Sequence, residues 1–187
     1  MHFKERVSSL GRNALITVYY EQRRDFSDMD LSEKAEKIRN TPNAGGSSVE
    51  SEVLSYELLH RCFGATLLKT ETEIEYFPTG GSITDYTCKL NDNTLGVSVT
   101  RAWKYRGDFE QEDAIHLLTK KLKGILNATR NAIERWHKQI LHIWTNSNDT
   151  AKLLRKEYKK LPNELVSNTV VLITVVKSPV TLFASQL

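Results

Sequence analysis

Hydrophobic positions recur at helical spacing just after a turn-rich stretch near residue 45. They are Val49, Val53, Leu54, Leu58, Leu59 and Cys62. Ser47 and Glu50 have the spacing of a capping box at the start of this segment, and Gly64 stands where the helix would end. The pattern therefore predicts a helix over residues 49–62.

Three extended segments follow this helix. Polar and apolar side chains alternate within residues 65–77, and residues 82–90 and 94–102 form the second and third segments. A Pro-Thr-Gly-Gly sequence at 78–81 breaks the chain between the first two segments, and Asn91-Asp92-Asn93 forms a tight turn between the last two. We therefore expect the second and third strands to pair as a hairpin.

The second half of the chain alternates between helices and strands. The apolar spacing predicts a long helix over 110–137, a strand at 139–145, a helix at 150–161 and a strand at 169–176. The last strand is apolar throughout, which is typical of a strand covered on both faces. The order of elements predicts a mixed α/β domain with helices packed on a central sheet.

The composition shifts divide the chain into three parts. Residues 1–46 are expected to be an N-terminal extension and linker, with a short strand at 14–20 and a polar helix at 31–39. Residues 47–176 form the α/β domain, and residues 177–187 form a C-terminal tail. Whether residues 1–46 pack on the domain stays open at this point.

Length and composition narrow the class of protein. A chain of 187 residues with 40% hydrophobic and 26% charged residues is typical of one globular domain. Its net charge of +3 does not by itself indicate a nucleic-acid binder. Two cysteines exclude a disulfide framework and a cysteine-rich zinc site.

The sequence also bears on location and on enzyme class. The polar start lacks the apolar run of a secretory signal, and no stretch approaches the roughly 18 apolar residues of a membrane span. We therefore expect an intracellular protein, in the cytoplasm or nucleus, with no membrane association. The motifs of P-loop, Rossmann, serine-hydrolase and zinc-protease sites do not occur, which removes most nucleotide-dependent and hydrolase classes.

Two short sequences on the predicted hairpin carry a resemblance to a known family. They are Ile83-Thr84-Asp85-Tyr86 and Gly96-Val97-Ser98-Val99-Thr100-Arg101. With the element order, they make the chain similar to the restriction-endonuclease-like, or PD-(D/E)-x-K, superfamily. The resemblance implies an α-β-β-β-α-β core with helices packed on a central mixed sheet. It also implies an Asp on the second strand and an acid-x-Lys pair on the third, around one or two divalent metal ions, here Mg²⁺ or Mn²⁺.

The third strand departs from the family pattern. Residues two apart on a strand point to the same face, so an acid-x-Lys pair places both groups over one site. Aligned on Asp85, the acid position is Ser98 and the lysine position is Thr100. A hydroxyl is a poor sole metal ligand, and Thr supplies no cation. We therefore expect Asp85, Ser98 and Thr100 to form a degraded catalytic site. If the site is active, the protein would be a weak metal-dependent endonuclease or exonuclease.

The predicted helix at 49–62 could complete a metal site. Some relatives use a helix carboxylate, and Glu52 or Glu57 could serve here. We take Glu57 with Asp85 as the candidate metal ligands, while a solvated helix face is the simpler interpretation of these glutamates.

Basic residues near this site suggest contacts to phosphate. Arg101, Lys104, Lys120 and Lys121 are the candidates for nucleic-acid binding. The aromatic rings of Trp103 and Tyr105 could stack on bases, or could cover the edge of the sheet. The sequence thus predicts a domain that binds DNA or RNA; the alternative is a non-catalytic protein-interaction or scaffold domain. Convergence of the basic residues on one concave face would favour binding, and scatter would favour the scaffold.

Overall fold

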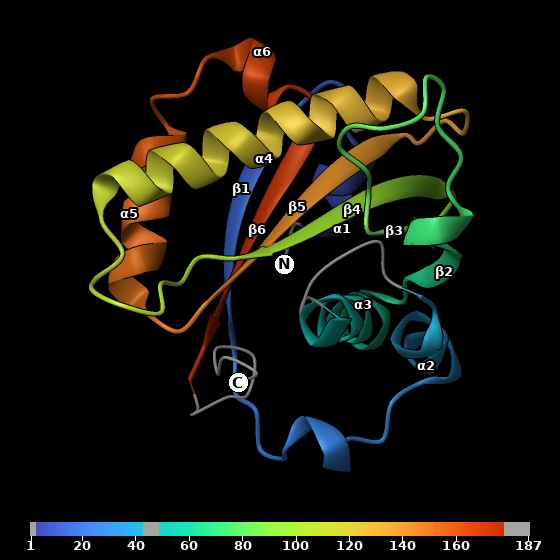
Figure 1. Cartoon of the computed structure of the whole chain (residues 1–187), viewed down its shortest axis with the longest axis horizontal. Coiled ribbons are helices and arrows are strands. Elements are labelled where there is room, and N and C mark those ends of the chain that lie inside the picture. Colours follow the sequence, from blue (N-terminus) through green and yellow to red (C-terminus); the bar gives the residue numbers. More distant parts are fainter. Residues whose placement is uncertain (1–2, 43–48, 178–187) are drawn as a thin grey trace.

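A computed structural model describes residues 3–42 and 49–177, which form a six-stranded mixed sheet with helices on both faces (Figure 1). In sheet order the strands are β1 (Ala14–Tyr20), β6 (Thr169–Val176), β5 (Lys138–Thr145), β4 (Asn93–Arg101), β3 (Tyr86–Leu90) and β2 (Thr66–Thr70). The first four strands are mutually parallel, while β3 and β2 each pair antiparallel to their neighbours. The predicted α/β class with helices on a central sheet is confirmed.

The helices cover the sheet in two layers. One face is covered by α1 (Phe3–Ser8), α2 (Glu33–Asn40) and α3 (Val49–Phe63). The other is covered by α4 (Gln111–Asn131), α5 (Asn148–Tyr158) and α6 (Asn163–Val166). In Figure 1 the sheet lies between α4 above and α3 below. None of the helices in the described ranges is long and apolar enough to cross a membrane.

The apolar strand at 169–176 behaves as predicted. All eight residues of β6 are buried, with Val170 and Leu172 packed toward the α3 side and Val171 and Ile173 toward the α4 side. Because β6 lies between β1 and β5, both its edges are also paired. A strand enclosed in this way has no polar face, which explains its continuous apolar sequence.

The described residues before position 43 belong to the same packed unit. Strand β1 pairs parallel with β6 along its whole length, and the ring of Phe3 stacks on that of Phe63 at 4.2 Å between centroids. Phe3 and Val7 are fully buried. The segment expected to be an extension and linker therefore supplies an edge strand and part of the core. Ser47, which was expected to cap α3, and the tail at 178–187 lie outside the described residues.

The first predicted strand is shorter than the alternation suggested. Strand β2 ends at Thr70, and Glu71–Glu73 form a 3₁₀ turn. The Glu73 carboxylate accepts the Thr70 N–H at 2.9 Å, a capping arrangement that replaces continued strand pairing. The alternation of glutamates therefore marks a capped turn rather than a strand.

The long helix also ends earlier than predicted, at Asn131 instead of residue 137. Beyond it, Ile133 donates its N–H to the Glu75 carbonyl at 2.9 Å, and Phe77 donates to the Asn131 carbonyl at 2.8 Å. The chain after α4 thus pairs with the loop before β3 rather than continuing the helix. These contacts fix that loop beside α4.

Candidate functional site

A cavity of about 270 Å³ lies between α4, the end of β4 and the loop before β3. Asp85 and Ser98 line it from the sheet, and Lys120 and Lys121 line it from α4. The structure therefore brings together four of the residues that the sequence analysis selected. They come from three separate parts of the chain.

The hairpin register explains why Asp85 and Ser98 are neighbours. Tyr86 pairs with Val97, and both side chains enter the core on the α3 side. Because side chains alternate, the preceding Asp85 and the following Ser98 face the α4 side. Asp85 donates its N–H to the Val97 carbonyl at 3.0 Å, although regular β3 begins one residue later.

The Asp85 carboxylate also makes a structural contact. Its Oδ2 accepts a hydrogen bond from the backbone N–H of Val99 at 2.5 Å. Val99 lies on β4 just beyond the last residue that pairs with β3. This contact fixes the carboxylate at the wall of the cavity. The position predicted for a metal ligand is thus rigidly held.

A glycine on α4 lets the loop close over the cavity. A Cβ atom at Gly124 would lie 3.0 Å from Ser82 Oγ, closer than ordinary packing allows without a shift. Gly81, Ser82 and Ile83 form the loop side of the cavity. A glycine inside a helix destabilises it by about 1 kcal/mol relative to alanine. Sequence reasoning missed this element, although an isolated glycine in a helical pattern is a signal for close approach.

The surroundings of Asp85 shift its protonation. Burial, and after it the negative charge of Glu52, raise the pKa of Asp85 to about 7, against the opposing effects of the Val99 N–H and the positive charge of Lys121. Near neutral pH the carboxyl is therefore close to half protonated. Perturbed carboxyl groups of this kind, at the wall of a cavity, are typical of functional sites.

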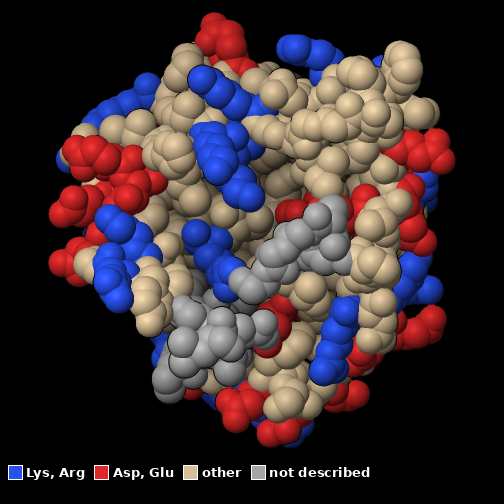
Figure 2. All heavy atoms as spheres, viewed as in Figure 1, with Lys and Arg blue, Asp and Glu red and all other residues tan. Residues whose placement is uncertain are grey.

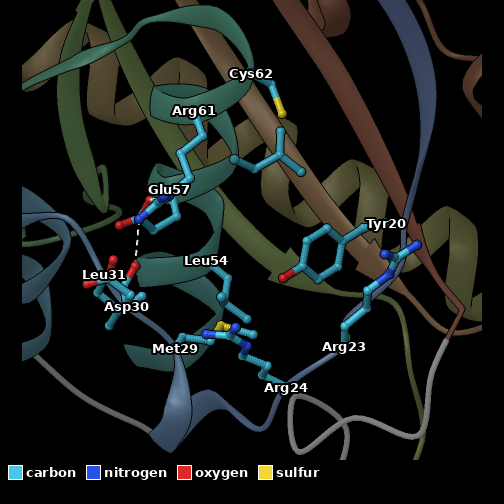
Figure 3. Close-up of a pocket in the computed structure, with 11 residues that line it drawn as sticks. Tyr20, Arg23, Arg24, Met29, Asp30, Leu31, Leu54, Glu57, Arg61 and Cys62 are labelled. Atoms are coloured by element: carbon cyan, nitrogen blue, oxygen red, sulfur yellow. Dashed lines mark hydrogen bonds and ion pairs between the residues drawn. The ribbon is translucent and has the colours of Figure 1, made fainter.

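The structure separates Glu57 from Asp85. Glu57 accepts the Ser32 N–H and the Arg61 Nε–H, the latter at 2.6 Å, in another cavity of about 440 Å³ (Figure 3). Burial raises the pKa of Glu57, but these two donors outweigh it and lower the pKa overall. Glu52 is instead the helix carboxylate whose charge acts on Asp85. Five residues correspond to about 140° around a helix, so the two glutamates face different ways.

The cavity offers few ligands to a metal ion. In residues 3–42 and 49–177 no group of three or more His, Cys, Asp or Glu side chains is placed to hold one. Asp85 and the hydroxyl of Ser98, which is 6% exposed, are the oxygen-bearing side chains at its sheet wall. Thr100 follows Ser98 by two residues on β4, but it is not among the described residues that line the cavity. The site thus contrasts with the expected set of two carboxylates and a lysine.

Of the four predicted phosphate contacts, two lie at the Asp85 cavity, one lies at another cavity and one lies at neither. Lys120 and Lys121 line the Asp85 cavity, and Figure 2 shows Lys and Arg side chains gathered over and below α4, beside a hollow. Lys104 lies at another cavity beyond the end of β4 and pairs with Asp113 at 2.9 Å. Arg101 ends β4 and is not among the described residues lining either cavity. The basic residues therefore converge only in part.

Trp103 and Tyr105, the two aromatic residues that could stack on bases, follow the end of β4, as Lys104 does. Trp103 lines the cavity beyond β4, and its ring makes an edge contact with Tyr105 at 6.2 Å between centroids. The Tyr105 side chain is 65% exposed. Neither ring lies at the Asp85 cavity.

Comparison with known proteins gives one relative and no family. No known family model matches the chain. A Dictyostelium discoideum protein described as "AAC-rich mRNA clone AAC4 protein" is 47% identical over 153 residues, which cover 78% of this chain and 22% of that protein. The chain thus spans about a fifth of the length of the curated relative that it matches. That description names neither an activity nor a ligand.

Proposed function

We propose that this chain is a nucleic-acid-binding domain with a restriction-endonuclease-like core, in which phosphodiester cleavage is lost or weak. The observation that carries the proposal is the convergence of Asp85, Ser98, Lys120 and Lys121 on one cavity. Two lysine side chains on the α4 wall of the cavity suit a phosphate more than an apolar ligand.

The order of the elements supports the proposed fold. Helix α3 precedes the antiparallel strands β2, β3 and β4, and α4 then leads to β5, which lies parallel to β4. This is the α-β-β-β-α-β order that the resemblance implies. Asp85 also lies at the start of the second strand of that core, where the family places its metal-binding Asp.

The chemistry of the cavity favours binding over cleavage. A phosphate between Lys120 and Lys121 would meet two positive charges, while Ser98 and Thr100 replace the second carboxylate and the lysine needed for hydrolysis. Mg²⁺ or Mn²⁺ would be held by Asp85 with at most the nearby Glu52 from α3. Such a sparse ligand set supports weak metal-dependent chemistry at best.

Binding is tested with labelled single- and double-stranded DNA and RNA over a series of salt concentrations. Lys121→Gln should weaken affinity about 5- to 10-fold and reduce the salt slope by about 1, because one phosphate contact is lost. Lys152→Gln is the matched control, since Lys152 pairs with Asp149 on α5, away from the cavity. If both variants bind like the wild type, phosphate does not enter this cavity.

The protonation of Asp85 gives a second, independent test. A protonated carboxyl leaves the positive charges of the lysines unopposed, so affinity should be about fourfold or more higher at pH 6 than at pH 8. Asp85→Asn should bind equally well at both values. A wild-type affinity that does not change across this range would contradict the proposed site.

Cleavage is measured on the same substrates with Mg²⁺ or Mn²⁺. Activity that disappears in Asp85→Ala while binding persists would show that the degraded site still hydrolyses phosphodiesters. Binding without cleavage in either protein is the result expected. If the protein binds none of these substrates, the alternative of a non-catalytic interaction or scaffold domain would be favoured instead.

A further inference from the structure

A second cavity, of about 440 Å³, lies on the opposite side of the sheet from Asp85 (Figure 3). Its walls come from α3, from the end of β1 and from the segment that follows β1. Leu54 and Leu58 on α3 and Met29 and Leu31 on the segment form its apolar lining. This lining suits the hydrocarbon part of a small molecule.

Two hydrogen-bond donors lie at this cavity, the half-buried Tyr20 hydroxyl and the exposed Arg24 guanidinium. Figure 3 shows the Tyr20 hydroxyl directed across the cavity toward Leu54, and Arg24 entering from the segment after β1. Among the described residues, no hydrogen bond or ion pair joins the Tyr20 hydroxyl or the Arg24 guanidinium. A phenol and a guanidinium together suit an anionic acceptor, because both can donate to it.

Two carboxylates, those of Asp30 and Glu57, line the cavity, and that of Glu57 is paired with Arg61. Glu57 is held by Arg61 and by the Ser32 N–H, and Arg61 also donates to the Asp30 carbonyl at 2.5 Å. The pairing with Arg61 reduces the repulsion between Glu57 and an incoming anion, although burial and, after it, the Glu57 charge raise the pKa of Tyr20. Three arginines, Arg23, Arg24 and Arg61, stand against the two carboxylates in the lining, so the net charge of the cavity wall favours an anion.

We propose that this cavity binds a small amphipathic carboxylate, with its apolar part against Leu54 and Leu58 and its carboxylate at Tyr20 and Arg24. The guanidinium fork of Arg24 matches a carboxylate in a two-point contact, and the Tyr20 hydroxyl adds a third donor. The cavity is independent of the nucleic-acid site, since the sheet separates the two.

Cys62 provides a local readout. Its thiol is exposed and lines this cavity, whereas Cys88, the other cysteine of the sequence, is buried. Decanoate is used as the probe, and the rate of Cys62 alkylation by iodoacetamide is followed by mass spectrometry. Decanoate should slow alkylation several-fold in a saturable manner, while 1-decanol and decyltrimethylammonium, which lack the carboxylate, should protect at least tenfold less efficiently.

Three variants at the cavity and one control variant make the result specific. Arg24→Gln should raise the decanoate concentration needed for protection about tenfold, because a charged hydrogen bond is lost. Tyr20→Phe should raise it about threefold. Leu58→Trp should fill the cavity and abolish protection, and Lys121→Gln should change nothing. Equal protection by decanoate and decanol, or protection that survives both Leu58→Trp and Arg24→Gln, would overturn the proposal.

Discussion

His142 and Asp85 are two titratable side chains held on opposite faces of the same sheet, and they differ in what surrounds them. His142 lies beneath α3, where its ring nitrogens contact Ser55 Oγ and Thr174 Oγ1, both at 2.7 Å. Ser55 in turn contacts the Tyr86 hydroxyl at 2.8 Å, so the buried chain of polar groups is satisfied by neutral partners. Asp85 has charged neighbours, Glu52 and Lys121, and borders a cavity.

The two environments shift the pKa of their titratable groups in opposite ways. Burial lowers the pKa of His142 to about 3, which keeps the ring neutral and hydrogen-bonded at every ordinary pH. Burial and a like charge raise the pKa of Asp85 to about 7, so its charge changes near neutral pH. The hydrogen-bonded His142 ring is compatible with the core in its neutral form, whereas an ionised Asp85 carboxylate is disfavoured by its burial. Such an unfavourable burial is typical of a site kept for binding or chemistry.

The largest expected effect is the loss of stability in acid that originates at His142. The native pKa is about 3, below the ordinary value of 6.5, so the unfolded chain binds the proton first. Each pH unit below 6.5 should therefore remove about 1.4 kcal/mol, or about 3 kcal/mol by pH 4.5. His142→Gln lacks this titration, and the difference between its urea unfolding curves and those of the wild type measures the contribution.

His116 supplies the control for this experiment, since its side chain is exposed on α4. His116→Gln should keep the wild-type dependence on pH. Identical pH slopes for wild type and His142→Gln would show that the buried network does not exclude the proton, and the contrast with Asp85 would fail.

Asp85 should act in the opposite direction. Its native pKa of about 7 exceeds the ordinary value of 3.8, so the stability it contributes is fully present below pH 3.8 and is lost as pH rises through 7. Asp85→Asn should therefore be more stable than the wild type by about 1–3 kcal/mol at pH 8, and nearly equal to it at pH 4. Asp108→Asn, at an exposed loop position, should change stability by less than about 0.5 kcal/mol at either pH. A destabilised Asp85→Asn at pH 8 would mean that the carboxylate stabilises the hairpin.

The neighbours of Asp85 can be separated by their opposite effects. Glu52→Gln should lower the pKa of Asp85, because a negative charge is removed, and Lys121→Gln should raise it, because a positive charge is removed. An NMR titration of the aspartate carboxyl carbons measures both shifts. Glu57→Gln is the matched control on the same helix and should leave the titration of Asp85 unchanged. A shift with Glu57→Gln equal to that with Glu52→Gln would place both glutamates at the site.

Local patterns predicted much of this arrangement. The tight turn at 91–93 fixed the hairpin, and the alternation of side chains then placed Asp85 beside Ser98. The same alternation places His142 and Trp144 on one face of β5, where both are buried and the His142 ring is hydrogen-bonded.

Other features depend on contacts that local patterns do not encode. Whether Glu52 or Glu57 acts on Asp85 depends on how α3 is rotated about its axis against the sheet. Tertiary packing determines that rotation. The parallel pairing of β1 with β6 joins segments about 150 residues apart, and such pairing leaves no local turn signal. Lys104 was separated from Lys120 because α4 runs back along the sheet from the end of β4.

The smallest expected change in the free energy of unfolding comes from Gly124→Ala, at the point where the loop before β3 approaches α4. Gly124→Ala gains about 1 kcal/mol of helix propensity, but its Cβ would lie 3.0 Å from Ser82 Oγ and 3.3 Å from Ser82 Cβ, so the loop must shift. The two effects should nearly cancel in the wild-type background. In a Ser82→Gly background the obstructing atoms are absent, so the same substitution should stabilise by about 1 kcal/mol. Urea unfolding of the four proteins measures this coupling. Equal effects of Gly124→Ala in both backgrounds would mean that the loop does not press on the helix, and the closed wall of the Asp85 cavity would lose its support.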